Sequence, residues 1–143
     1  ENSAAIGENN SLILAKSSIA LGVQNTINGT TVTESNTRSL AVGFQNTVRG
    51  YSSAALGGNN DVDTAQNGFA IGFNNILTTG GDNNFAIGEN NTQLDTNANG
   101  VYMLGNSLEG EDGEFTLGYR NDRSSYPTED FKSRYRYWDS STI

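Results

Sequence analysis

Residues 18–25 read Ser18-Ile19-Ala20-Leu21-Gly22-Val23-Gln24-Asn25, and variants of this stretch recur along most of the chain. Alignment on the glycine gives eight registers, 13 to 21 residues apart: Gly7, Gly22, Gly43, Gly57, Gly72, Gly88, Gly105 and Gly118. The residue before the glycine is aliphatic in every register, and six registers carry alanine one position earlier: Ala5, Ala20, Ala41, Ala55, Ala70 and Ala86. Asparagine stands three positions after the glycine in seven registers: Asn10, Asn25, Asn46, Asn60, Asn75, Asn91 and Asn121. So regular a short repeat predicts units that stack on one another.

The spacing around each glycine is that of a β-strand, in which side chains alternate between two faces. The residue three before the glycine, such as Phe69 or Phe85, shares a face with the aliphatic residue, and we expect this pair to fill the interior. The alanine and the glycine share the other face. We expect this nearly bare face to be the subunit interface. The asparagine suits a left-handed turn and could stack into a ladder between coils.

A second short strand is indicated by apolar residues five positions after the glycine: Leu12, Ile27, Val48, Val62 and Leu77. The sequence therefore predicts an all-β, parallel β-roll or β-solenoid of about eight coils over residues 1–121. The longest step, 21 residues, places an outward loop around Asn28 to Asn36. One coil buries too few large side chains to offset its ordering entropy of about 1–2 kcal/mol per residue. Neighbouring coils must stack, and we expect partner chains as well.

Composition excludes several classes of function. The net charge of −8 with no His disfavours a nucleic-acid partner, because phosphate binding needs a basic surface. The absence of Cys rules out disulfides and thiolate metal sites. Apolar runs stay well short of 18 residues, so no membrane insertion is expected in this segment. The chain begins at Glu1 without Met, which favours a piece of a longer protein.

The segment 122–143 differs from the repeats, and we interpret it as a cap or connector. Residues 119–143 hold five basic and four acidic residues, a net charge of +1. The other 118 residues hold three basic and twelve acidic residues, a net charge of −9. Atypical terminal repeats are expected in solenoids. The cluster Tyr135, Arg136, Tyr137 and Trp138 could also be a binding surface, because Tyr, Trp and Arg dominate interface hot spots.

The candidate chemistry is sparse, and we predict no enzyme and no cofactor. The run from Asn59 to Asp63 alternates oxygen ligands, so Asp61 and Asp63 are weak calcium candidates. The acids Glu109, Glu111, Asp112 and Glu114 could serve a glycan-cleaving tailspike, although a solvated loop suits this Gly-rich run better. Sequons at Asn28 and Asn90 have meaning only where asparagine is glycosylated.

The pattern Ser-x-Ala-x-Gly-x-x-Asn over roughly residues 3–121 resembles the head repeats of YadA-like trimeric autotransporter adhesins, and similar repeats occur in phage tail fibres. The resemblance implies a left-handed parallel β-roll, a homotrimer, and a place outside the cell, on a cell or virion surface. It also implies a non-enzymatic structural and adhesive role toward a host or cell-surface protein or glycan. The alternative is a fragment of an enzymatic phage tailspike.

Overall fold

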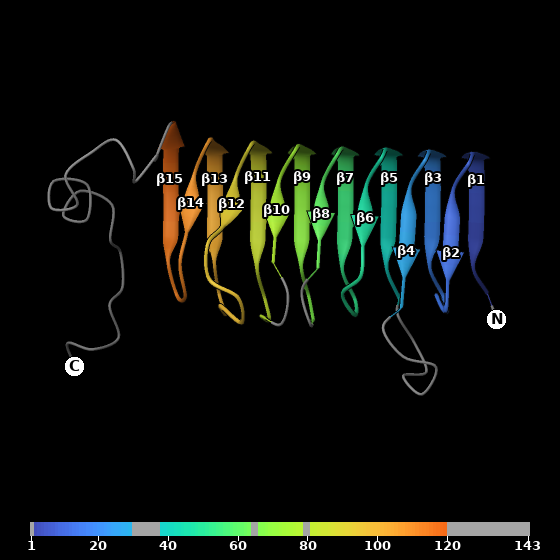
Figure 1. Cartoon of the computed structure of the whole chain (residues 1–143), viewed down its shortest axis with the longest axis horizontal. Helices are drawn as coiled ribbons and strands as arrows, with labels where there is room; N and C mark the ends of the chain where they lie inside the picture. Colours follow the sequence, from blue (N-terminus) through green and yellow to red (C-terminus); the bar gives the residue numbers. More distant parts are fainter. Residues whose placement is uncertain (1, 30–37, 64–65, 79–80, 120–143) are drawn as a thin grey trace, which may run out of the picture.

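The computed structural model describes residues 2–29, 38–63, 66–78 and 81–119, and all its regular structure in these residues is β-strand. The eight long strands pair in parallel, in chain order, and form the first sheet: β1 (Ala4–Glu8), β3 (Ile19–Val23), β5 (Leu40–Phe44), β7 (Ala54–Gly58), β9 (Phe69–Phe73), β11 (Phe85–Glu89), β13 (Tyr102–Asn106) and β15 (Phe115–Tyr119). The short strands form the second sheet: β2 (Ser11–Ile13), β4 (Thr26–Asn28), β6 (Thr47–Val48), β8 (Asp61–Val62), β10 (Ile76–Leu77), β12 (Thr92–Gln93) and β14 (Glu109–Gly110). The molecule is a parallel β-solenoid whose coils follow one another along its long axis (Figure 1).

The strand register confirms the repeat alignment. Each repeat glycine in the first sheet lies opposite the glycine of the next coil, from Gly7 opposite Gly22 to Gly105 opposite Gly118. The described residues complete about seven turns, because the eighth register contributes only β15 and Asn121 lies outside the described residues. The longest part of the predicted outward loop, residues 30–37, is also outside them. The all-β solenoid is thus confirmed, while the left-handed sense and the trimer stay predictions.

The interior of the solenoid contains the opposite face from the one predicted. Ala20, Ala41, Ala55, Ala70 and Ala86 are fully buried, and they pack against the apolar residues of the second sheet. Those partners are Ile27, Val48, Val62 and Leu77. The aliphatic residues beside the alanines point outward instead. The alternation is as predicted, but its direction is reversed, because closely apposed sheets leave room for methyl groups on one side only.

The repeat glycines allow the coils to approach closely. Gly72 has a φ of +121°, a conformation that side chains with a Cβ rarely adopt. A Cβ on Gly72 would also lie 2.9 Å from the carbonyl carbon of Gly88 and nearer still to its oxygen. The same relation links each repeat glycine to the next coil as far as Gly105, which meets Gly118. Glycine is therefore needed for conformation and for space at once.

The predicted asparagine ladder is present and buried. Asn25, Asn46, Asn60, Asn75 and Asn91 each donate an Nδ2–H to the Oδ1 of the preceding asparagine, over 2.8 to 3.1 Å, and the ladder starts at Asn10. Each of these five residues also donates to its own coil's carbonyl four positions back and to the next coil's glycine carbonyl. The side-chain amides thus give hydrogen-bond partners to buried backbone carbonyls that would otherwise have none. Leu108 ends the ladder, and its N–H still donates to Asn91 Oδ1.

The last complete coil keeps its interior volume by exchanging large and small residues between the sheets. Met103 replaces the alanine of the first sheet and is fully buried. Gly110 replaces the aliphatic residue of the second sheet, and a Cβ there would lie 3.1 Å from the Met103 sulfur. The larger residue on one sheet therefore occupies the space left by the smaller residue on the other.

Candidate functional site: the apolar outer face of the first sheet

The outer face of the first sheet is covered by apolar side chains that the single chain leaves exposed. Two columns run the length of the sheet, three positions and one position before each glycine. The first is Ala4, Ile19, Leu40, Ala54, Phe69, Phe85, Tyr102 and Phe115, and the second is Ile6, Leu21, Val42, Leu56, Ile71, Ile87, Leu104 and Leu117. Their members are half-buried or exposed, up to 56% for Ile6. We call these two columns the apolar face.

Aromatic rings gather in the C-terminal half of the apolar face. The Phe69 and Phe85 rings stack with their centroids 5.3 Å apart and their planes 11° from parallel. The Tyr102 ring follows, with its centroid 6.3 Å from that of Phe85. Because the rings stack along the solenoid axis, they cover each other's faces and leave edges outward. Such edges suit interdigitation with another apolar surface better than stacking with a flat ligand.

The extent of the apolar face exceeds what scattered surface residues produce. Seven strand spacings of about 4.8 Å and the three residues of strand that the two columns span give an area on the order of 300 Å². Nine of the thirteen large exposed hydrophobic residues of the described chain lie on the strands of the first sheet. The largest apolar patch on a soluble monomer is of about this size and is often functional.

The alanine columns cannot serve as the predicted subunit interface. Ala20, Ala41, Ala55, Ala70 and Ala86 have no exposed surface, so no partner can reach them. Ala5 shares their column and is exposed only because β1 is the edge strand of the sheet. The prediction was wrong because the two faces of an alternating strand were assigned in reverse.

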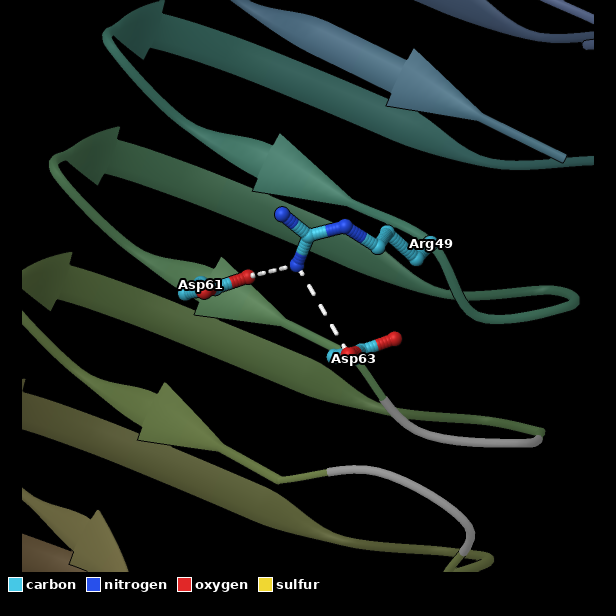
Figure 2. A network of polar contacts seen from close by, with 3 residues as sticks. All are labelled: Arg49, Asp61 and Asp63. Atoms are coloured by element: carbon cyan, nitrogen blue, oxygen red, sulfur yellow. Dashed lines mark hydrogen bonds and ion pairs between the residues drawn. The ribbon is translucent and has the colours of Figure 1, made fainter. Parts of the chain in front are cut away.

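The outer face of the second sheet is mostly polar, although Ile13 and Ile76 are exposed on it, and it carries the two weak calcium candidates. Arg49 lies between them, with its Nη1 2.8 Å from Asp61 Oδ1 and 3.7 Å from Asp63 Oδ2 (Figure 2). Among the described residues, no group of three or more His, Cys, Asp or Glu side chains is placed to hold a metal ion. The guanidinium thus takes the position that a calcium ion would need between the carboxylates.

Burial is the main influence on the acidity of Asp61. Partial burial raises the pKa of Asp61 above its usual 3.8, the Arg49 charge opposes this rise, and the Asp63 charge adds to it. Both members of the Arg49–Asp61 pair remain more than a third exposed. A surface ion pair of this kind contributes about 0–1 kcal/mol to the free energy of unfolding, so it adds little to the stability of the solenoid.

The acids considered for glycan cleavage lie on the last turns, where two of them bind backbone. The N–H of Glu111 donates to Glu114 Oε2 at 3.0 Å, and the N–H of Asn99 donates to Asp112 Oδ1 at 2.6 Å. Glu109 lies on β14. These bonds give Asp112 and Glu114 a structural use in closing turns. Nothing in this arrangement tests whether the chain is an enzyme.

The predicted C-terminal surface falls outside the described residues. It comprises Tyr135, Arg136, Tyr137 and Trp138, and the whole segment 122–143 is likewise outside. The division between a repeat domain and a connector therefore stays a prediction.

Sequence reasoning missed a second polar ladder at the opposite turn. The N–H of Ser39 donates to Ser18 Oγ at 3.0 Å, and Ser39 Oγ donates to the carbonyl of Gly50. The N–H of Gly68 binds Ser53 Oγ in the same way. The signal was the serine that opens the Ser-x-Ala-x-Gly pattern. The left-handed turn residue was predicted to be the ladder asparagine, three positions after the glycine. The structure places it one position earlier, at residues such as Gln24, Asn74 and Asn90, and the ladder asparagines do not have positive φ.

Comparison with known proteins assigns no family: no protein-family model matches the sequence, and no curated protein matches it either. Within the part of the chain that the structure describes, no helix has the length and apolar character needed to cross a membrane.

Proposed function

We propose that this chain is a non-enzymatic, structural and adhesive segment of an extracellular trimeric fibre, of the kind found in YadA-like bacterial adhesin heads or in phage tail and virion fibres. The observation that carries the proposal is the apolar face, which follows the solenoid from β1 to β15. A rod with one apolar side is suited to lie alongside copies of itself. The trimer therefore forms through this face and not through the alanines.

Burial of the apolar face supplies the driving force for assembly. At about 25 cal/mol per Å², covering roughly 300 Å² per chain contributes on the order of 8 kcal/mol per chain before the costs of association. A closed cyclic arrangement lets every copy cover its face while the rods run side by side. The outer face of the second sheet, which is mostly polar, then faces water.

The adhesive role and the location outside the cell rest on the repeat pattern. The solenoid gains its order from backbone pairing and buried amides, and the chain contains no Cys. The partner class that we propose is a protein or glycan on a host or cell surface. The glycan-cleaving tailspike is the alternative, and no contact in the described residues favours it specifically.

The first experiment measures the mass of the assembled full chain in solution. We expect a trimer for the natural sequence. Ile71→Lys and Ile87→Lys place charges on the apolar face and should yield monomers or soluble aggregates. Thr47→Lys changes the outer face of the second sheet on β6 and should leave the trimer intact. A fully folded monomer of the natural chain at micromolar concentration would contradict the proposal.

A second experiment separates adhesion from cleavage. Trimers are applied to immobilised cell-surface glycans and to intact cells, and both bound protein and released sugar are measured. Binding without release supports an adhesive segment. Progressive release of sugar that depends on Glu109 or Glu114 would favour the tailspike instead.

A further inference from the structure

The turn that follows each of the first seven long strands places one side chain in the same backbone position, where it is exposed in five turns and half-buried at Asn59 and Ser107. This position, two residues after the repeat glycine, is Asn9, Gln24, Gln45, Asn59, Asn74, Asn90 and Ser107, and all seven have positive φ, between 53° and 58°. Asn9, Asn74 and Asn90 are exposed. We call this position the turn site. It lies beyond the apolar columns, at or just past the end of the first-sheet strand.

Two residues after the turn site, the chain enters the second sheet with a side chain that points outward. In β12 this residue is the half-buried Thr92, whereas the following Gln93 is buried. In β2 the corresponding residue is Ser11. Asn9-Asn10-Ser11 and Asn90-Asn91-Thr92 are therefore complete Asn-x-Ser/Thr sequons, each with its acceptor amide at the turn site.

We propose that Asn9 and Asn90 are acceptor sites for an N-linked glycan on the folded solenoid. The inference does not depend on the trimer or on adhesion. It rests on the coincidence, in two of seven turns, of an exposed left-handed asparagine with an outward hydroxyl residue two positions later. Glycosylated asparagines belong on surface turns of this type.

The contacts of the turn-site amides leave room for the modification. Asn90 Oδ1 accepts a hydrogen bond from Asn74 Nδ2 at 2.7 Å, a bond that a glycan on Asn90 Nδ2 would preserve. Asn9 Nδ2 makes an exposed contact of 3.3 Å with Glu8 Oε1, and one of its two hydrogens suffices for this contact. The neighbouring Asn91 differs, because it is fully buried and its Nδ2 donates to three oxygen atoms.

The reaction needs a glycosyltransferase and a sugar activated as a phosphate ester. The Nδ2 of the asparagine forms a bond to the anomeric carbon of the sugar, while the bond from that carbon to the phosphate oxygen breaks. The phosphate leaves with the bonding electrons, and one amide proton passes to a base of the transferase. The product keeps one N–H and the side-chain carbonyl, which are the groups that the turn uses.

The chain contains its own matched controls. Asn59 and Asn74 occupy the turn site, but Asp61 and Ile76 stand where the hydroxyl is required. Gln45 occupies the turn site and has Thr47 two positions later, but it lacks the asparagine. Ile76→Thr and Gln45→Asn should therefore each create a new acceptor at Asn74 and at position 45, while Asn90→Gln should remove one.

The test incubates the folded full chain with a soluble asparagine glycosyltransferase and a nucleotide-activated hexose, and locates the added hexose by mass spectrometry of peptides. Peptides spanning residues 5–14 and 86–95 give the reference rates. We expect Asn9 and Asn90 in the folded chain to react within about tenfold of the peptides, because no opening of the fold is required. Ile76→Thr and Gln45→Asn should each add one hexose.

Either of two results would overturn the inference. One is a folded chain that stays unmodified at Asn90, or reacts there only as fast as it unfolds, while the peptide is modified. The other is a failure of the peptides themselves, since the sequon would then not be read with asparagine in its middle position. Modification of Asn90 without any gain from Ile76→Thr would show that the turn site is not the determinant.

Discussion

Replacement of Gly72 by alanine tests whether the glycine column sets the distance between coils. The added Cβ would lie 2.9 Å from the carbonyl carbon of Gly88. Carbon atoms in contact are about 3.5–4.0 Å apart, and the Gly88 oxygen lies nearer still, so the next coil must move away by at least about 0.6–1.1 Å. The Asn90 N–H to Phe73 carbonyl bond and the Asn75 Nδ2 to Gly88 carbonyl bond are each 3.0 Å long. Both would stretch to about 3.6 Å or more, beyond hydrogen-bonding distance.

The expected loss in the free energy of unfolding of Gly72→Ala has two parts. Loss of these two bonds and of the Asn91–Asn75 amide bond costs about 0.5–1.5 kcal/mol each. Holding alanine at the φ of +121° costs a further 1–3 kcal/mol or so. The total is about 2.5–7.5 kcal/mol, a large share of a typical folding free energy. Gly118→Ala is the matched control, because Gly118 has a φ of +147° and no atom of the described residues lies within 4 Å of an added Cβ, so strain is the main cost that remains.

Urea unfolding followed by far-UV circular dichroism measures the two losses at one protein concentration. Amide hydrogen exchange at Asn75 and Asn90 shows whether the opening is local to the Gly72 coil. We expect Gly72→Ala to lose at least about 1.5 kcal/mol more than Gly118→Ala. Equal losses for the two variants would refute the reasoning, because strain alone would then explain the glycine column.

Three further perturbations address the ladder, the interior and the polar sheet. Asn60→Asp places a carboxylate against Asn46 Oδ1 and the carbonyls of Leu56 and Gly72, so it should destabilise the chain more than Asn60→Leu at pH 7 and recover on acidification, as pH-dependent unfolding would show. Met103→Ala and Gly110→Val should each destabilise, by about 2–5 and 1–3 kcal/mol, and the double variant should recover at least about 1 kcal/mol in a thermodynamic cycle. The raised pKa of Asp61 means that its carboxyl proton is held more tightly in the folded chain than in the unfolded chain. The contribution of Asp61 to the free energy of unfolding should therefore fall as pH rises from 3.8 through the folded pKa. Asp61→Asn should remove that part of the slope of stability against pH, and an unchanged slope would contradict the cause given for the shift.

The repeat itself was predictable because its signals are local. The repeat glycine has no room for a Cβ, and the ladder asparagine makes buried contacts with its amide, so few other residues fit at either position. Both columns can therefore be recognised in the sequence even though the spacing between repeats varies. The exchange between Met103 and Gly110 was not predictable, because those residues lie on different sheets and only the register brings them together. The Arg49 ion pair was missed for the same reason, since Asp61 belongs to the next coil.

The face that points inward could not be read from alternation, because either assignment satisfies a period of two. The volume of the side chains decides which face points inward. The interior accepts Ala70 opposite the aliphatic side chains of the second sheet, and the larger Ile71 and Phe69 must therefore lie outside. Hydrophobic residues at positions where a single chain cannot bury them are unfavourable for a monomer. They recur on strand after strand from β1 to β15, and the trimer proposed above would cover them along the length of the rod. The same steric limit that excludes the alanines as an interface thus directs the search for a partner to the apolar face.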